Sequence, residues 1–207
     1  MKNTTNKVSW VVFAVLAVTI GVYPLVYFVV DRKFGLLASK SEALLSNTFW
    51  NIGFYGHILF GGLALLIGWL QFSEKIRRSH PKRHRLVGKI YIISVFISGI
   101  CALYIGGYAT GGMIASLGFI SLGIIWLFTT GMAYNAARKK DFSLHKGFMI
   151  YSYAACFAAV TLRIWLPILN LVFDDFIVAY RIVAWLCWVP NIIFAYFWVR
   201  KKGLILG

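Results

Sequence analysis

Six long apolar segments divide this chain and constrain its fold more than any other feature. Each is about 22 residues long, and a helix of roughly 20 apolar residues crosses a hydrocarbon core about 30 Å thick. The segments are residues 8–30, 50–72, 86–108, 113–134, 147–168 and 177–199. We therefore expect an all-α integral membrane protein in which residues 1–207 form a single bundle of six transmembrane helices.

The composition excludes the main soluble classes of protein. Hydrophobic residues make up 60% of the chain and charged residues 13%, whereas soluble domains average roughly 45–50% and 25%. A membrane β-barrel is excluded as well, because it needs alternating strands of about 10 residues and these segments are continuously apolar. The net charge of +15 does not indicate a nucleic-acid partner, because the basic residues cluster between the apolar segments.

The basic residues predict the orientation. Sixteen of the 21 lysines and arginines lie at the termini, in the connections after the second and fourth segments or, in the case of Lys89, at the start of the third segment, whereas the remaining connections hold Arg32, Lys33 and Lys40. Cytoplasmic connections of membrane proteins are enriched in Lys and Arg. We therefore expect a multi-pass protein of the cell membrane with both termini in the cytoplasm. The inner basic connections are expected to contact anionic lipid headgroups.

The second segment carries a histidine in a row of small residues. Gly53, His57, Gly61, Ala64, Gly68 and Gln71 are spaced by three or four positions, which puts them on one helical face. Small residues allow close helix packing, in which case His57 hydrogen-bonds a neighbouring helix. An ionisable residue inside a membrane is also a candidate functional residue. Both interpretations stay open at this point.

His84 and His145 begin the third and fifth segments and are expected at a similar depth on the cytoplasmic side. Two imidazoles from different helices at one depth are what axial ligation of a haem requires, and basic residues nearby would neutralise its propionates. A closed metal site usually needs four ligands. With only His80 as a third candidate, we expect no metal-ion site.

A second group is expected on the outer side. Arg163 and Arg181 lie inside the fifth and sixth segments near their outer ends, and His57 lies at a comparable depth. A guanidinium in hydrocarbon costs roughly 2.5–3.5 kcal/mol on insertion scales unless it is paired or reaches the interface. We expect these three residues to converge on a quinone or a small anionic ligand, with Asp174 or Asp175 as an alternative internal partner.

Several of these residues stand in motifs that resemble a known family. The motifs are His57-x3-Gly61, Gly68-Trp69-Leu70-Gln71-Phe72, His84-Arg85-x2-Gly88, His145-Lys146-Gly147-Phe148-Met149 and Thr161-x-Arg163-x-Trp165. From about Trp50 to the C-terminus the chain resembles an uncharacterised family of bacterial multi-span membrane proteins, classed as a domain of unknown function. The resemblance implies a bacterial inner membrane but no established activity.

A more distant resemblance is to the b-type cytochromes and ferric-reductase-like bundles. Those proteins present two histidine pairs within the bilayer, whereas this chain has only four histidines and His80 lies in a connection. The resemblance therefore implies at most one haem b, held by His84 and His145.

Three functions remain open from the sequence, and no enzymatic activity is assigned. The most specific is a redox membrane protein that binds a b-type haem or a quinone. The second is a transport protein for a small molecule or ion, although the predicted bilayer interior has no carboxylate to relay protons. The third is a non-catalytic membrane partner or assembly component.

Overall fold

The computed structural model describes residues 2–31 and 33–204, so Arg32, one of the predicted outer basic residues, lies outside the described residues. Within these ranges the chain forms helices and turns and no strand, which confirms the all-α class. The α-helices are α1 (Lys2–Val22), α2 (Glu42–Leu45), α3 (Thr48–Gly68), α4 (Glu74–Ser79), α5 (Pro81–Gly106), α6 (Met113–Arg138), α7 (Phe142–Cys156), α8 (Ala158–Phe173), α9 (Phe176–Leu186) and α10 (Val189–Lys201). The 3-10 helices are η1 (Tyr23–Phe28), η2 (Gly35–Ser39) and η3 (Trp69–Phe72).

The predicted membrane spans are confirmed in number. Over the described ranges, six helical segments are long and apolar enough to cross a membrane, and two of them differ clearly in extent from the prediction. The third begins at Pro81 rather than at residue 86, because proline is suited to the first turn of a helix. The fifth begins at Phe142, because the Asp141 carboxylate accepts a hydrogen bond of 2.9 Å from the backbone N–H of Leu144.

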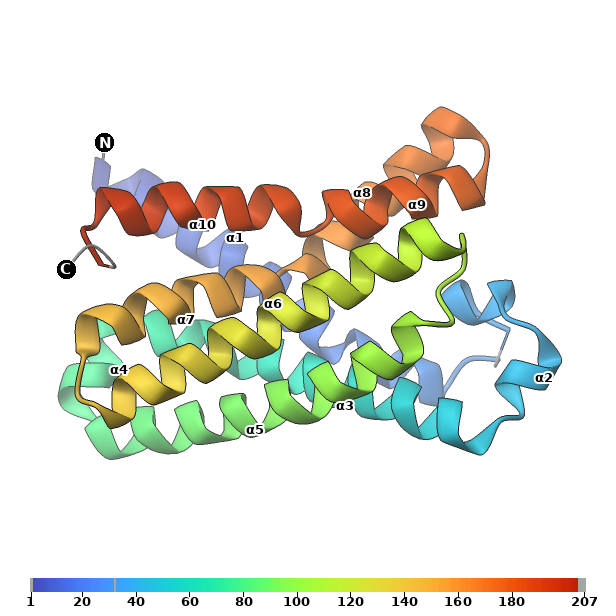
Figure 1. Cartoon of the computed structure of the whole chain (residues 1–207). Helices are drawn as coiled ribbons and strands as arrows, with labels where there is room; N and C mark the ends of the chain where they lie inside the picture. The colour runs from blue at the N-terminus through green and yellow to red at the C-terminus, as the bar shows by residue number, and fades with distance from the viewer. Residues whose placement is uncertain (1, 32, 205–207) are drawn as a thin grey trace.

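The helices pack as a bundle around α5 and α6 (Figure 1). Helix α5 packs against α3 and α6, α6 packs against α7 and α9, α1 lies on α3, and α10 lies on α7. Both chain ends lie at the same end of the bundle as α4 and the turn between α6 and α7, whereas α2 and the tip of the α8–α9 hairpin lie at the other end (Figure 1). A chain with an even number of spans begins and ends on the same side of the membrane, as this arrangement shows.

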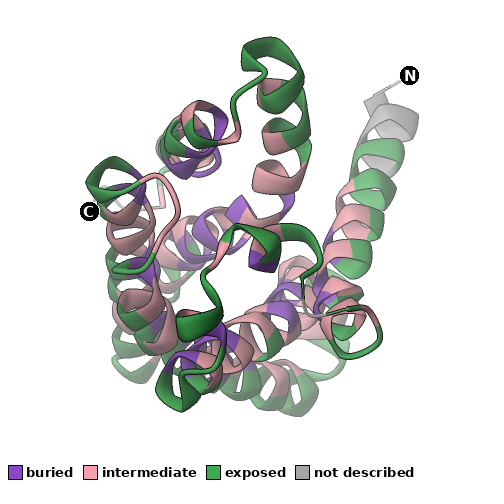
Figure 2. Ribbon diagram, turned by 90° about the vertical axis from the view of Figure 1, so that its right-hand side faces the viewer, coloured by how far each residue is buried: buried purple, intermediate pink, exposed green. Residues whose placement is uncertain are grey.

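The distribution of burial is that of a chain surrounded by lipid. Buried residues line the inside of the bundle, and exposed residues cover its outer faces and connections (Figure 2). Much of the exposed surface is apolar; for example, the side chains of Val29 and Leu171 are 87% and 86% exposed. Continuous apolar surface of this kind marks contact with a membrane or another protein.

Spans five and six are each interrupted within their apolar sequences. The fifth breaks at Phe157, between α7 and α8, and the sixth breaks after α9, around Cys187. Thr161 donates a hydrogen bond to the Cys187 carbonyl, and the Asn191 amide donates to the carbonyls of Cys187 at 3.0 Å and Ala154 at 3.3 Å. Two side chains thus satisfy carbonyls that a break exposes, as backbone groups in lipid require.

A chain of hydroxyl groups ties α5, α6 and α7 together in the core. The Tyr91 hydroxyl donates to Ser152 at 2.8 Å, Ser152 donates to Thr130 at 2.7 Å, and Thr130 donates to the Trp126 carbonyl at 2.7 Å. Tyr91, Ser152 and Thr130 are fully buried or nearly so. This network links three spans through their interior.

We expect Ser152→Ala to lower the free energy of unfolding by about 1 kcal/mol, because it leaves two buried hydroxyls without their partner. The thermal unfolding midpoint of the purified protein in detergent measures this effect. Ser121→Ala is the matched control, since no described residue hydrogen-bonds the Ser121 hydroxyl. Equal midpoints for the two variants would contradict a stabilising role of the network.

Candidate functional site

The inner pair of histidines comes from two different helices at the end of the bundle that carries both termini. His84 lies in the first turn of α5, and His145 lies in the first turn of α7. Their imidazoles are close enough to interact electrostatically. Helix α5 packs chiefly against α3 and α6, and α7 packs against α6, so the two histidines stand on helices that share α6 as a neighbour.

His145 is held in one tautomer by the backbone. Its Nδ1 lies 2.9 Å from the carbonyl oxygen of Ala133 on α6. A carbonyl only accepts, so Nδ1 carries the proton and Nε2 presents a lone pair. Histidines that ligate metals usually donate their other ring N–H to a carbonyl or carboxylate in this way. His145 is therefore prepared to act as a ligand or a proton acceptor through Nε2.

Two buried polar atoms near His84 have no hydrogen-bond partner among the described residues. They are His84 Nδ1 and Gln71 Nε2. Gln71 faces Gly88, one turn along α5 from His84, because a Cβ atom added to Gly88 would lie 3.5 Å from Gln71 Oε1. Buried polar groups are nearly always paired with protein or ordered water, and the indole N–H groups of Trp50, Trp69 and Trp126 also have no partner among the described residues. The sequence placed Gln71 on the face of His57 and did not identify it as part of this site.

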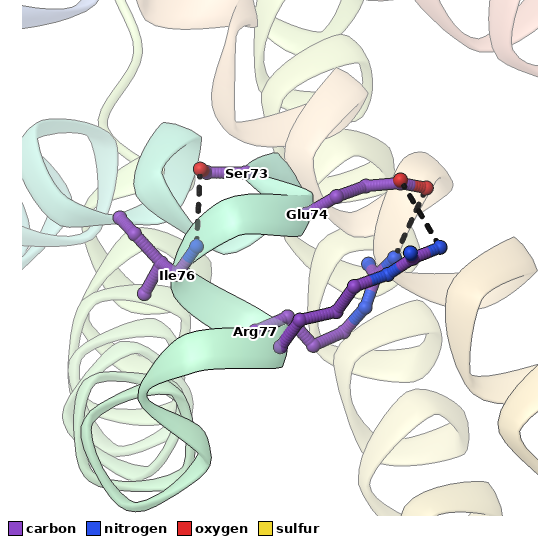
Figure 3. A network of polar contacts seen from close by, with 5 residues as sticks. Ser73, Glu74, Ile76 and Arg77 are labelled. Carbon is purple, nitrogen blue, oxygen red and sulfur yellow. Dashed lines mark hydrogen bonds and ion pairs between the residues drawn. The ribbon is translucent and has the colours of Figure 1, made fainter.

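The basic connection beside the inner pair is ordered by a short helix. The Ser73 hydroxyl caps α4 by accepting from the backbone N–H of Ile76, and the Glu74 carboxylate points toward Arg77 (Figure 3). The Glu74 carboxylate pairs with Arg77 at 3.3 Å and with Arg78 at 3.6 Å. The charge of Arg77 is also close enough to His84 to act on it. A half-buried cation thus lies beside the inner histidines.

His80 stays apart from this group as the exposed residue at the junction of α4 and α5. Across residues 2–31 and 33–204, no cluster of three or more His, Cys, Asp or Glu side chains could hold a metal ion.

His57 is bound to the neighbouring helix α5. Its Nδ1 lies 3.0 Å from Ser98 Oγ and 3.2 Å from the Ser98 carbonyl oxygen, and Ser98 Oγ also donates to the His57 carbonyl at 2.9 Å. Because the Ser98 hydroxyl proton is used for the His57 carbonyl, His57 Nδ1 carries its own proton and Nε2 is left as an acceptor.

The small residues around His57 serve helix packing. An added Cβ at Gly61 would lie 2.9 Å from Ser98 Oγ, and one at Gly53 would lie 2.9 Å from a side-chain carbon of Ile105. At Gly68 the nearest atom, a ring carbon of Tyr153, would lie at 2.4 Å. The face therefore contacts α5 and α7 rather than lipid.

Among the predicted outer residues, Arg163 is held by its own helix and by the first span. The Arg163 guanidinium donates to the Ala159 carbonyl at 2.9 Å and lies 4.5 Å from the ring centre of Tyr23. It is also close enough to His57 for an electrostatic interaction. Tyr23 was absent from the predicted site, because nothing in the first span marks its neighbour across the bundle.

Arg181 has a different environment from Arg163. Its Nε donates at 2.7 Å to the carbonyl of Gly111 in the connection between α5 and α6. In the described part of the chain, no hydrogen bond joins Arg181 to His57 or Arg163. Asp175 caps α9 by accepting from the backbone N–H of Ile177 at 2.7 Å.

Comparison with known proteins identifies a family and nothing more specific. A family model described as a predicted membrane protein (DUF2306) matches residues 54–199, which include all the inner and outer candidate residues except Tyr23. No curated protein and no solved structure matches the chain. With its six apolar spans, the chain belongs to the DUF2306 family of predicted membrane proteins, a domain of unknown function.

Proposed function

We propose that this protein is a redox membrane protein that binds one b-type haem between His84 and His145. The approach of these two imidazoles from α5 and α7, beside two orphaned buried polar atoms, carries the proposal. The iron of a b-type haem is bound by neutral imidazoles, so His84 and His145 are suitable ligands for it. When bound, the haem would supply one-electron oxidation and reduction.

The residues of the chain would have distinct roles in holding the group. His145 offers Nε2, because the Ala133 carbonyl holds its Nδ1 proton. His84 offers the second imidazole from α5, and the Gln71 side chain lies against Gly88, one turn further along the same helix. Arg77 supplies positive charge for propionate groups, in competition with its partner Glu74.

A quinone is the alternative occupant of the inner site. Gln71 Nε2 is a buried donor without an acceptor among the described residues, and a quinone carbonyl would satisfy it.

Interrupted spans such as five and six are also typical of transporters. In transporters the free carbonyls at such breaks bind the substrate or ion. Here Thr161 and Asn191 already donate hydrogen bonds to the Cys187 carbonyl. The breaks therefore favour transport less than the two histidines favour redox chemistry.

The absorption spectrum tests the haem. We expect protein expressed with added haem precursor to show a Soret band and, after reduction by dithionite, the sharp α band of a six-coordinate b-type haem. His84→Gly and His145→Gly should each lose the six-coordinate spectrum, because each variant lacks one of the two axial imidazoles. His80→Gly is the matched control and should retain the spectrum.

Addition of imidazole separates ligation from folding. If His145→Gly regains the spectrum with millimolar imidazole, its effect is on the ligand and not on the bundle. A folded wild-type protein without a Soret band, despite adequate haem supply, would exclude the haem. A stable complex with a quinone in the same preparation would then support the alternative.

A further inference from the structure

Arg163 is a cation inside a membrane span without a carboxylate to neutralise it. The chain has six acidic residues, and they lie elsewhere in the sequence: Asp31, Glu42, Glu74, Asp141, Asp174 and Asp175. Glu42 pairs with Lys33, Glu74 pairs with two arginines of α4, and Asp141 and Asp175 cap helices. Over residues 2–31 and 33–204, no ion pair reaches Arg163. Its charge has no counter-ion within the described chain.

The surroundings of Arg163 are arranged to present its donors. A guanidinium has five N–H groups, and the hydrogen bond to the Ala159 carbonyl uses one of them. The Tyr23 ring lies against the guanidinium and supports it by a cation–π contact. The Tyr27 hydroxyl and His57 are within electrostatic reach. These groups offer hydrogen bonds but no negative charge.

Arg163 is partly buried and lies beside the end of span one, where Tyr23 begins the 3-10 helix η1. Tyr27 lies beneath the connection that follows span one, since a Cβ added to Gly35 would lie 3.4 Å from its hydroxyl. On α8 the neighbours Ile164 and Ile168 are each 44% exposed, and in a membrane they face acyl chains. Arg163 thus belongs to a helix whose neighbouring residues face lipid, and its guanidinium lies against Tyr23 near the connection that follows span one.

We propose that Arg163, with Tyr23 and Tyr27, binds the oxyanion of a phosphate group, supplied by the headgroup of an anionic phospholipid in the outer leaflet. The planar guanidinium matches two phosphate oxygens at once, and the bound anion supplies the charge that the chain lacks. This site is separate from the inner histidines and does not depend on a haem or quinone there.

Lipid binding to the purified protein tests the proposal. The protein is placed in nanodiscs of phosphatidylcholine with or without phosphatidylglycerol, and thermal stability and bound lipid are measured, the latter by native mass spectrometry. We expect phosphatidylglycerol to stabilise the wild type, and Arg163→Gln to weaken its binding about tenfold, as the loss of a charge-assisted hydrogen bond predicts. Arg181→Gln is the matched control and should keep the wild-type affinity.

Further arms identify the source of the anion. Inorganic phosphate that stabilises the protein in phosphatidylcholine alone, through Arg163, would assign the site to a free anion instead of a lipid. If Arg163→Gln does not fold, Arg163→Lys replaces it and is expected to bind with intermediate affinity, because the charge remains and the forked geometry is lost. The proposal would be overturned if Arg163→Gln and Arg181→Gln bound the lipid with equal affinity. It would also be overturned if menaquinone stabilised the protein through Arg163 and phosphatidylglycerol did not.

Discussion

Gly68→Leu is expected to prevent the bundle from assembling. A Cβ atom at this position would lie 2.4 Å and 2.7 Å from two ring carbons of Tyr153 and 2.8 Å from one of Tyr91. Both rings are buried, and both hydroxyls are hydrogen-bonded, Tyr91 to Ser152 and Tyr153 to the Leu65 carbonyl. Neither ring can move away without breaking these bonds, so the larger leucine side chain must push α3 away from α7.

A pair of alanine variants makes this prediction quantitative. Gly68→Ala should destabilise the protein by about 1–3 kcal/mol, as overpacking of a dense core does. Gly131→Ala on α6 should be neutral or stabilising by up to about 1 kcal/mol, because alanine favours a helix over glycine. An added Cβ there would meet only Phe96, at 3.8 Å. The fraction of protein that stays monodisperse in size-exclusion chromatography after heating measures the stability of both variants. Equal stability of the two variants would mean that α3 does not pack against α7 at Gly68.

The second large effect concerns orientation. Cysteine introduced at Ser46 should react almost completely with a membrane-impermeant thiol reagent in intact cells, whereas cysteine at Ser79 should react only after the membrane is opened. Both positions are exposed and lie at opposite ends of the bundle, next to α2 and at the end of α4. The expected direction rests on the basic residues at the end that carries α4 and both termini.

The native chain supplies the control for this labelling. Its cysteines are Cys101, half-buried within α5, and Cys156 and Cys187, which are buried, so an impermeant reagent should leave the parent protein unlabelled. Labelling of Ser79→Cys but not of Ser46→Cys in intact cells would reverse the predicted topology.

The spans could be predicted from the sequence because the membrane imposes a local requirement. Each backbone N–H and C=O in hydrocarbon needs a partner, so every apolar stretch of sufficient length becomes a helix. The sequence also predicts the face on which a residue lies, since helical spacing alone puts His57, Gly61 and Gly68 in one row. Their contacts with α5 and α7 agree with that row.

The interruptions of spans five and six could not be predicted to the same extent. Pro190 near the start of α10 is a local signal for a break after α9, because proline has no N–H to continue the preceding turn. Nothing comparable marks Phe157. The break there is compatible with the membrane because the Asn191 amide donates to the Ala154 carbonyl at 3.3 Å, and a second bond of 3.2 Å from this amide to the Thr161 hydroxyl joins α10 to α8.

The sequence by itself determined the helical class, the number of spans and the helical face that His57 shares with Gly61 and Gly68. These follow from the rise and period of a helix and from the thickness of the bilayer. Only the tertiary structure decided that His84 and His145 approach one another, that Gln71 and Tyr23 join the candidate sites, and that Arg181 binds the Gly111 carbonyl. The physical reason is that the membrane depth and the helical face of a residue do not specify which residue of another helix lies beside it. Which helix lies beside which, and how far each is rotated, depends on the packing of side chains from distant parts of the chain.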